Sequence, residues 1–567
     1  MTYSELKSRI IDIWQAIYPD AGNVLIEGLI KDIKEIKQNI LASSNKEWYK
    51  DAVVYSLYVD LFNKDFKGLT EKLDYLQKLG INCIWLLPIL ESPMRDAGFD
   101  ISDYRVIRAD LLGLSENVSK NKKIQLFKNF IDEAHRKNIR VIFDIAINHT
   151  SDQHSWFIQA RSGKSNPYRD YYIWSDTTEK YRKARIIFEG LCKSNWQKEG
   201  YEYYFHRFFE FQPDLNYRNP KVLIEMTNNF LFWLNQGVDG FRADAIPYLW
   251  KDDGTDCENL PQTHLIVKFF RSVLDYVKPD TLLLAEACQP PHEVVKYFGD
   301  GDECHAGYHF PLMPQIYKAI EMQNASPIRN ILSPHITPPL PESAQWFTFL
   351  RCHDELSLEL VYVSEEDRKY IHEHYCHRPE WDFRLGQGIS ARLSELMKRN
   401  PEKIALAFSI MLSLPGTPVL YYGDEFGKVN DKTYYQEQKM ITGKNDTRYL
   451  VRGRIDWEKL ESELLQNHSL ASKVFSEVTK MLIVRKKYKA FGRGSLEFIP
   501  CITDEILGFY RIYKNEHLLI LNNLSSKPVE INIPYTISIK KDLLDAQIDL
   551  KNQIPPYGYK WYVLDNE

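Results

Sequence analysis

The sequence lacks the features that would place it in a membrane, on a nucleic acid or in an oxidising compartment. Its longest apolar run, "IALAFSIMLSL" from Ile404, is too short to span a bilayer. The net charge is −5, whereas a nucleic-acid-binding face is basic. The eight cysteines form no CxxC pair and no framework spacing, which predicts reduced thiols. The first residues, "MTYSELKSRIIDIWQAIY", contain no apolar signal core. We therefore predict a cytoplasmic protein without nucleic-acid or membrane partners.

The chain does have the size and composition of a multidomain globular protein. Its 567 residues exceed what one hydrophobic core usually holds, and the hydrophobic share of 44% is ordinary. Near the start, "NVLIEGLIKDIKEIKQNIL" repeats apolar residues three and four apart, which indicates amphipathic helix. We predict a helical extension over residues 1–48. The pattern leaves its role and the oligomeric state open.

Eight short apolar segments alternate with helical patterns through the middle of the chain. Strands separated by helices predict a parallel sheet, and eight such units are the number in a closed (β/α)₈ barrel. We assign the barrel to residues 49–148 and 221–487. The expected strands begin at Val53, Asn82, Val141, Gly240, Leu282, Gly307, Trp346 and Pro418.

Two stretches depart from this alternation. Residues 149–220 are rich in Tyr, Trp, Arg and Asp and have no clean period, so we predict a small domain inserted after the third strand. Residues 488–567 contain "GFYRIY", "HLLILNN" and "YKWYVL", which are typical of antiparallel strands. We therefore predict an α/β protein: a barrel, an inserted domain and a C-terminal antiparallel β-sandwich.

Polar residues follow several of the expected strands. The carboxyl ends of barrel strands face the mouth where active sites lie, so we expect these side chains to converge. Histidines at such a rim would donate hydrogen bonds to sugar hydroxyls. The polar rim consists of His149, Arg242, Asp244, Glu286, His353 and Asp354.

Three of these rim residues are carboxylates with an arginine beside them. Arg242 and Asp244 are two apart in a strand and point to the same face. Retaining glycoside hydrolysis needs one ionised carboxylate as nucleophile and one protonated carboxyl as acid, about 5 Å apart. We predict that Arg242 keeps Asp244 ionised and that Glu286 is the acid. Asp354 would raise the pKa of Glu286 and grip ring hydroxyls.

A metal-dependent hydrolase could use the same residue types on the same fold. Such enzymes usually carry an HxH pair at the first strand, and "VVYSLYVD" from Val53 contains no histidine. The histidine-rich "IHEHYCH" from Ile371 lies in a polar segment away from the rim. We expect no metal ligands at either place.

Six motifs stand in one order: "GINCIWLLP", "DIAINH", "GFRADA", "LAEA", "RCHDE" and "GTPVLYYGDE". Together they resemble glycoside hydrolase family 13, the α-amylase family. "QPDLN" from Gln212 resembles the marker of its oligo-1,6-glucosidase branch, which handles small α-glucosides. The resemblance implies that Asp244 is the nucleophile, Glu286 the acid/base and Asp354 the transition-state stabiliser.

Within that branch the strongest likeness is to trehalose synthases, which isomerise maltose and trehalose. It rests on "CENLPQTH", "YFGDGDECH", "HFPLMP" and "HDELSLELV". The match of "SPMRDAGFDISDY" implies that Asp96 binds the far hydroxyls of a sugar and that Phe99 stacks on its face. "RGRIDW" replaces a segment that shapes the acceptor side, and Arg452 aligns with its substrate-binding arginine.

The sequence also departs from that family pattern. Phe99 stands where Tyr is usual, and Cys352 stands where an Asn precedes the His–Asp pair. The calcium loop after the first strand is shortened to "NKDFKG". We therefore expect no cofactor, with calcium as the alternative.

The motifs predict a retaining enzyme that isomerises or transfers glucosyl units of maltose-type substrates through a covalent glucosyl-Asp244 intermediate. Hydrolysis of small α-glucosides is the first alternative, because water could replace the sugar acceptor. A non-catalytic carbohydrate-binding barrel is the second, although both expected catalytic carboxylates are present. In each case the partner is a small α-glucoside.

Overall fold

The computed structural model describes residues 1–567 except 41–42, 116–117, 500–502, 532–537, 546–552 and 566–567. Within the described part, no helix is both long and apolar enough to cross a membrane. The seven cysteines that the structure describes are all free thiols, and Cys501 lies outside the described residues. The cytoplasmic location stays a prediction.

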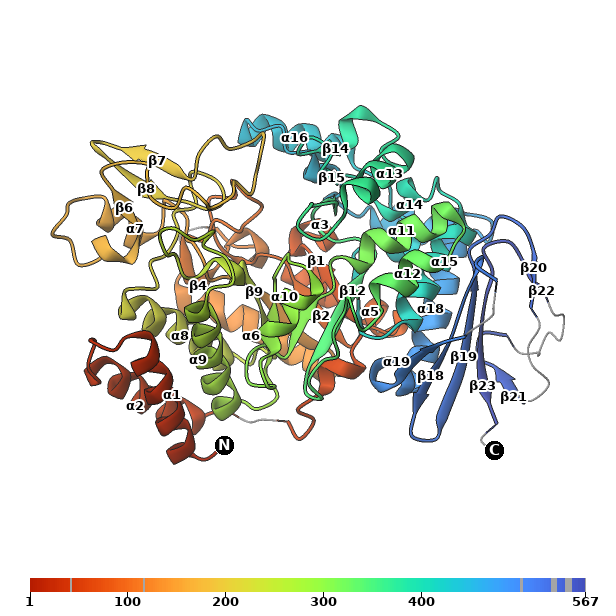
Figure 1. The fold of residues 1–567 in the computed structure, drawn as a ribbon, viewed down its shortest axis with the longest axis horizontal. Coiled ribbons are helices and arrows are strands. Elements are labelled where there is room, and N and C mark those ends of the chain that lie inside the picture. Colours follow the sequence, from red (N-terminus) through yellow and green to blue (C-terminus); the bar gives the residue numbers. More distant parts are fainter. Residues whose placement is uncertain (41–42, 116–117, 500–502, 532–537, 546–552, 566–567) are drawn as a thin grey trace.

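A closed barrel of eight parallel strands forms the centre of the molecule (Figure 1). All eight segments expected from the apolar pattern are strands of this barrel. The reason is that each is short, apolar and buried on both faces, as strands surrounded by helices must be. In chain order the strands are β1 (Val54–Leu57), β2 (Cys83–Leu86), β5 (Arg140–Ala146), β9 (Gly240–Asp244), β10 (Leu282–Ala285), β11 (Ala306–Tyr308), β12 (Gln345–Phe349) and β16 (Thr417–Tyr421).

Helices cover the outside of the barrel (Figure 1). Two of them begin with the same local device, an asparagine cap followed by proline. Asn219 accepts a hydrogen bond from the Lys221 N–H before α8, and Asn400 accepts one from Lys403 before α15. The main covering helices are α5 (Leu73–Leu79), α6 (Lys120–Arg136), α8 (Pro220–Leu234), α9 (Pro261–Val277), α11 (Leu312–Met322), α15 (Pro401–Ser413) and α18 (Leu470–Lys487).

The first residues form α1 (Tyr3–Ile17) and α2 (Val24–Lys37), which pack on α8 and α9. The apolar stripe of α1 is buried in this contact, including Leu6, Ile10 and Trp14. The Tyr18 hydroxyl donates to the Tyr217 carbonyl at 2.7 Å, next to the start of α8. The extension thus stabilises the outside of the barrel rather than reaching its mouth.

After β5 the chain leaves the barrel for a small irregular region. It contains α7 (Ser155–Ala160) and a three-stranded sheet in the order β6 (Trp174–Ser175), β8 (Glu202–Phe205), β7 (Trp196–Glu199). Figure 1 shows this region on the upper side of the molecule. Its exact boundaries as a domain stay a prediction.

A second excursion follows β12 and lies on the same upper side in Figure 1. Its sheet has the order β13 (Leu356–Ser357), β15 (Gly388–Ile389), β14 (Asp382–Phe383). The helices there are α13 (Glu365–Tyr375) and, after β16, α16 (Lys432–Thr442). These residues were predicted to belong to the barrel. The separate sheet was not predicted, because each of its strands is only two residues long.

The chain ends in an antiparallel sheet beside α15 and α18 (Figure 1). The Trp561 indole donates to the Ser409 hydroxyl of α15 at 3.0 Å, which ties the sheet to the barrel. A further pair, β20 (Val529–Glu530) and β22 (Gln553–Ile554), lies apart from it. The barrel with an antiparallel C-terminal region confirms the predicted fold class. The five strands are, in sheet order, β17 (Ser495–Phe498), β18 (Ile506–Tyr513), β19 (Glu516–Asn523), β23 (Tyr559–Leu564) and β21 (Ile539–Asp542).

Candidate active site

One pocket opens at the carboxyl ends of the barrel strands, and the predicted site residues meet there. Its accessible volume is only about 120 Å³, which is small for a sugar pocket. Arg452 is the one predicted residue that does not line the pocket, but its Nη2 donates to Asp354 Oδ1 at 2.8 Å. The predicted residues that line the pocket are Asp96, Phe99, His149, Arg242, Asp244, Glu286, His353 and Asp354.

Arg242 on β9 binds two carboxylates and lies close to a third. Its Nη1 is 2.5 Å from Asp244 Oδ1 and 2.6 Å from Asp144 Oδ1, and its Nη2 is 3.9 Å from Glu286 Oε1. Asp144 was not anticipated, although its charge inside the apolar "VIFDIAI" of β5 was a usable signal. A buried guanidinium that reaches both predicted catalytic carboxylates places Asp244 and Glu286 side by side.

A strained turn orients Glu286. Ala245, directly after Asp244, has φ 62° and ψ 35°, a left-handed conformation that costs a non-glycine residue about 1–2 kcal/mol. In this conformation its N–H donates to Glu286 Oε2 at 2.9 Å. The strained turn at the end of β9 therefore links this strand to the Glu286 carboxyl.

Burial acts on the pKa of both carboxyls of this pair. Burial raises the pKa of Asp244 to about 7, against the opposing charge of Arg242. Burial also raises the pKa of Glu286 to about 7, with Arg242 opposing and Asp244 and Asp354 adding to the rise. Arg242 lowers the pKa of Asp244 by its charge and its hydrogen bond, and it also pairs with Asp144. The two carboxyls therefore titrate together in the same pH range.

Asp354 has the opposite environment. Although burial alone would raise its pKa, His353, Arg448 and Arg452 together hold it well below the usual range. The Asp354 carboxylate is 3.0 Å from His353 Nε2, 3.1 Å from Arg448 Nη1 and 2.8 Å from Arg452 Nη2. Asp354 is thus an ionised acceptor, as a residue that grips hydroxyls must be.

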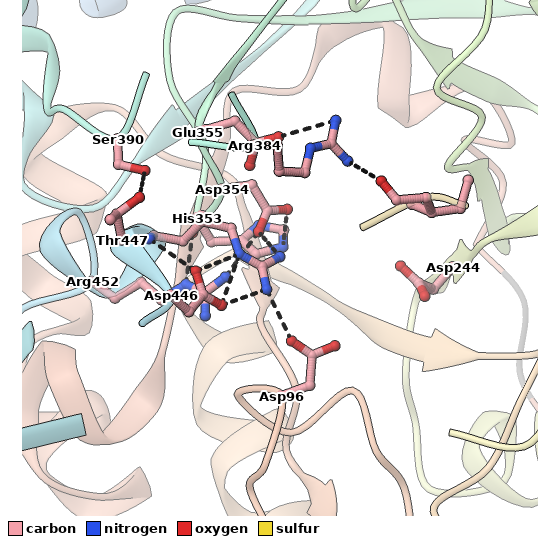
Figure 2. A network of polar contacts seen from close by, with 12 residues as sticks. Asp96, Asp244, His353, Asp354, Glu355, Arg384, Ser390, Asp446, Thr447 and Arg452 are labelled. Carbon is pink, nitrogen blue, oxygen red and sulfur yellow. Dashed lines mark hydrogen bonds and ion pairs between the residues drawn. The ribbon is translucent and has the colours of Figure 1, made fainter. Parts of the chain in front are cut away.

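Arg448 links this cluster to Asp96 and was not among the predicted residues. Figure 2 shows Asp96, Asp354, Asp446 and Arg452 in this network. The Arg448 Nη2 is 3.2 Å from Asp96 Oδ1 and 2.6 Å from Asp446 Oδ2. The only sequence signal was its spacing of four residues from Arg452. The Phe99 ring stacks on His353, with 5.4 Å between the ring centroids. These contacts make one wall of the pocket polar and rigid.

His149 is a buried residue of the pocket lining. Burial lowers its pKa to about 4, so its ring is neutral near pH 7 and can donate one hydrogen bond. Gln212, from the "QPDLN" motif, donates to Asp96 at 3.0 Å and lies 3.4 Å from His149. The motif residue therefore supports two predicted sugar-binding side chains.

A salt-bridge cluster joins the inserted region to the excursion after β12. We call the part of the pocket lining that it holds, Ile187, Glu359 and Arg384, the upper wall. Arg384 donates to Glu359 at 2.7 Å and to the Ile187 carbonyl at 2.8 Å. Arg185 of the inserted region reaches the other oxygen of Glu359 at 3.0 Å and Glu258 at 2.8 Å. This cluster was not predicted, because its members lie far apart in the chain. Glu258 and Glu359 stand in the motifs "CENLPQTH" and "HDELSLELV", but neither motif indicates which arginine they bind.

In the shortened calcium loop, two polar side chains bind backbone groups, and the absence of a metal there stays a prediction. Asp65 accepts from the Gly68 N–H at 2.8 Å and so caps α4 (Phe66–Glu71), and Asn63 donates to the Gly68 carbonyl. These groups bind their own backbone, whereas calcium requires six to eight converging oxygens. Elsewhere in the described part of the chain, one group of three possible metal ligands is found, Cys352, His353 and Asp354. It belongs to the pocket already described.

The fold and the pocket define a carbohydrate-active barrel enzyme, and comparison with known proteins gives the family. The α-amylase catalytic-domain model matches residues 42–490, and the chain belongs to the α-amylase family.

Within this family the chain is similar over most of its length to trehalose synthases. It is 37% identical to the trehalose synthase/amylase of Mycolicibacterium smegmatis, over 92% of this chain and 93% of that protein. It is 38% identical to the trehalose synthase of Pimelobacter sp., over 88% and 91%. Among solved structures, the isomaltulose synthase of Klebsiella sp. LX3 superposes with a TM-score of 0.70 at 25% identity, covering 91% of this chain and 99% of that one. The predicted resemblance to the family and to trehalose synthases is confirmed.

Proposed function

We propose that this protein interconverts maltose and trehalose by transferring a glucosyl unit through Asp244. The observation that carries the proposal is the placement of Asp244 and Glu286 on one buried guanidinium at the barrel mouth. The similarity to trehalose synthases along the chain supports the choice of substrate.

In the first step, Asp244 attacks C1 of the α-linked glucose while the Glu286 proton goes to the departing oxygen. The products are a β-glucosyl ester on Asp244 and a free glucose, with Glu286 now ionised. In the second step, Glu286 takes the proton of the anomeric hydroxyl of that glucose, whose oxygen attacks C1 and releases Asp244. Asp354 binds ring hydroxyls throughout. The product is an α,α-linked disaccharide, and no net water is consumed.

The outcome depends on whether glucose or water reaches the ester first. The small pocket volume and the Arg384–Glu359–Arg185 cluster favour retention of the first glucose, because they close the wall above it. Hydrolysis is the competing outcome whenever this wall opens. A disaccharide must also enter this way, so the wall has to move in each cycle.

The direct test is incubation with maltose and separation of the products by NMR. If trehalose forms faster than free glucose, the chain is an isomerase. If glucose is the only product, the isomerase proposal is wrong and the hydrolase alternative holds. If neither forms while maltose binds, the chain is a binding barrel.

The pH profile of kcat/KM on maltose should be a narrow bell centred near pH 7. Because burial raises the pKa of both Asp244 and Glu286 to about 7, activity falls at lower pH as the nucleophile gains a proton. Activity falls at higher pH as the acid loses its proton, by up to about tenfold per pH unit on each side. Initial rates in buffers of constant ionic strength measure the profile. A plateau from about pH 5 to about pH 9 would contradict this pairing.

Replacing Arg384 with alanine should shift the enzyme towards hydrolysis. The loss of its bonds to Glu359 and the Ile187 carbonyl opens the upper wall, and we expect a roughly three- to tenfold rise in glucose released per trehalose formed. Product ratios by NMR at matched conversion measure this. The control is Arg182→Ala, an exposed arginine of the inserted region that pairs only locally with Glu179. An unchanged ratio in Arg384→Ala would show that other contacts exclude water.

A further inference from the structure

A second cavity, of about 440 Å³, lies outside the sugar pocket. It is formed where the start of α16 meets the short helix η6 (Pro379–Trp381). Neither the family motifs nor the proposed reaction uses it. Its main side chains are Arg378, Trp381, Arg399, Lys428, Asp431 and Lys432.

The cavity is electropositive in a protein whose net charge is negative. Four cationic side chains line it, against two carboxylates, Glu395 and Asp431. Both carboxylates are engaged by the protein itself. Glu395 pairs with Arg399 at 3.0 Å, and Asp431 accepts from the Tyr434 N–H at 2.9 Å as the cap of α16. The cations of the lining outnumber its carboxylates by two, although Arg378 and Lys432 also pair with Glu380 next to it.

Two donors among its lining residues are incompletely satisfied. Among the residues that the structure describes, no carboxylate lies within ion-pair distance of Lys428, whose ammonium donates only to the Arg454 carbonyl at 2.7 Å. Burial and the nearby Arg392 lower the pKa of Lys428 to about 8. Trp381 is 3% exposed, and its indole N–H has no hydrogen-bond partner within the described part of the chain.

The start of α16 adds backbone donors. The first N–H groups of an α-helix have no partner within the helix, and α16 is eleven residues long. Lys432 and Thr433, its first two residues, line the cavity. The positive end of the helix dipole thus points at the same space as the four cations.

We infer that this cavity binds the phosphate group of a small metabolite. A phosphate offers several acceptor oxygens and about two negative charges, which match clustered Arg and Lys side chains at a helix N-terminus. The volume exceeds that of phosphate alone and leaves room for a body of monosaccharide size. The bound anion would supply the anionic partner that Lys428 lacks among the described residues.

Binding there would act on one wall of the sugar pocket. Trp381 stands three residues before Arg384, and β14 lies between them. Lys432 and Arg378 now hold η6 through Glu380, at 3.2 Å and 3.9 Å. A phosphate that draws both cations inward would change how η6 and β14 are held and therefore the position of Arg384. Sugar binding and phosphate binding would then influence each other reciprocally.

The test is calorimetric titration of the full chain with inorganic phosphate and, separately, with glucose 6-phosphate, with chloride at equal ionic strength as the blank. We expect saturable binding of phosphate. Combined replacement Arg399→Ala and Lys432→Ala should raise the Kd by roughly tenfold or more. Both side chains are exposed, so the fold should tolerate their loss. The matched control is Arg454→Ala, an exposed nearby arginine outside the lining, which pairs with Glu437.

The affinities of the parent protein, the double variant and Arg454→Ala for phosphate decide whether the cavity is a phosphate site. Binding that weakens in the double variant but not in Arg454→Ala supports the site, and tighter binding of glucose 6-phosphate identifies a phosphorylated sugar rather than free phosphate as its ligand. Absence of saturable binding, or equal binding by the double variant, overturns it.

Slower amide exchange of residues 381–390 on phosphate binding would confirm the link to the pocket wall, and unchanged exchange would refute that link. None of these readouts requires turnover of maltose, so they stand apart from the proposed function.

Discussion

Replacement of Asp244 by asparagine is expected to lower kcat on maltose by at least about 10⁴-fold. An amide of the same shape cannot form the glucosyl ester, whereas it can keep a hydrogen bond to the neighbouring Arg242. Maltose binding should therefore change little while turnover is lost. Product formation by NMR and maltose affinity by calorimetry measure the two effects separately.

The control is Asp252→Asn, which removes an exposed carboxylate paired with Arg218 and should leave kcat unchanged. Chemical rescue gives a sharper criterion. In Asp244→Ala, the space of the lost carboxylate should admit azide, which attacks the α-glucosyl carbon from the opposite face and yields β-glucosyl azide. A kcat for Asp244→Asn within tenfold of the parent enzyme would remove Asp244 from the role of nucleophile.

Replacement of Arg242 by methionine should destabilise the protein and abolish activity together. Arg242 is the only cation bonded to both Asp144 and Asp244 among the described residues, and its loss leaves two buried carboxylates unpaired. Breaking a buried pair of this kind costs about 3–5 kcal/mol. The urea midpoint of unfolding, followed by circular dichroism, should fall accordingly.

A second substitution separates stability from catalysis. Adding Asp144→Asn to Arg242→Met removes one unpaired charge and should recover part of the lost stability, because contacting residues couple. Activity should stay absent, since Asp244 and Glu286 still lack their shared arginine. The control is Arg218→Met, an exposed arginine whose pairing with Asp252 should contribute little. An Arg242→Met protein of unchanged urea midpoint would refute the structural role assigned to this residue.

The barrel was predictable because its signals are local. Each barrel strand is a short apolar run, and the flanking helices carry their own stripes and caps, so alternation alone indicated the topology. The rim residues were predictable for the same reason. Arg242 and Asp244 share a strand face, and Glu286 and Asp354 follow strands directly, so position along the chain implied position at the mouth.

The sequence by itself therefore determined the fold class, the family and the carboxylates at the barrel mouth. Only the tertiary structure shows that Asp144 from β5 also binds Arg242 and that burial raises the pKa of both Asp244 and Glu286. The tertiary structure also determines which contacts close the pocket. The contacts of Arg384 with Glu359 and the Ile187 carbonyl join segments up to 197 residues apart, and no periodicity along the chain encodes a contact of that range.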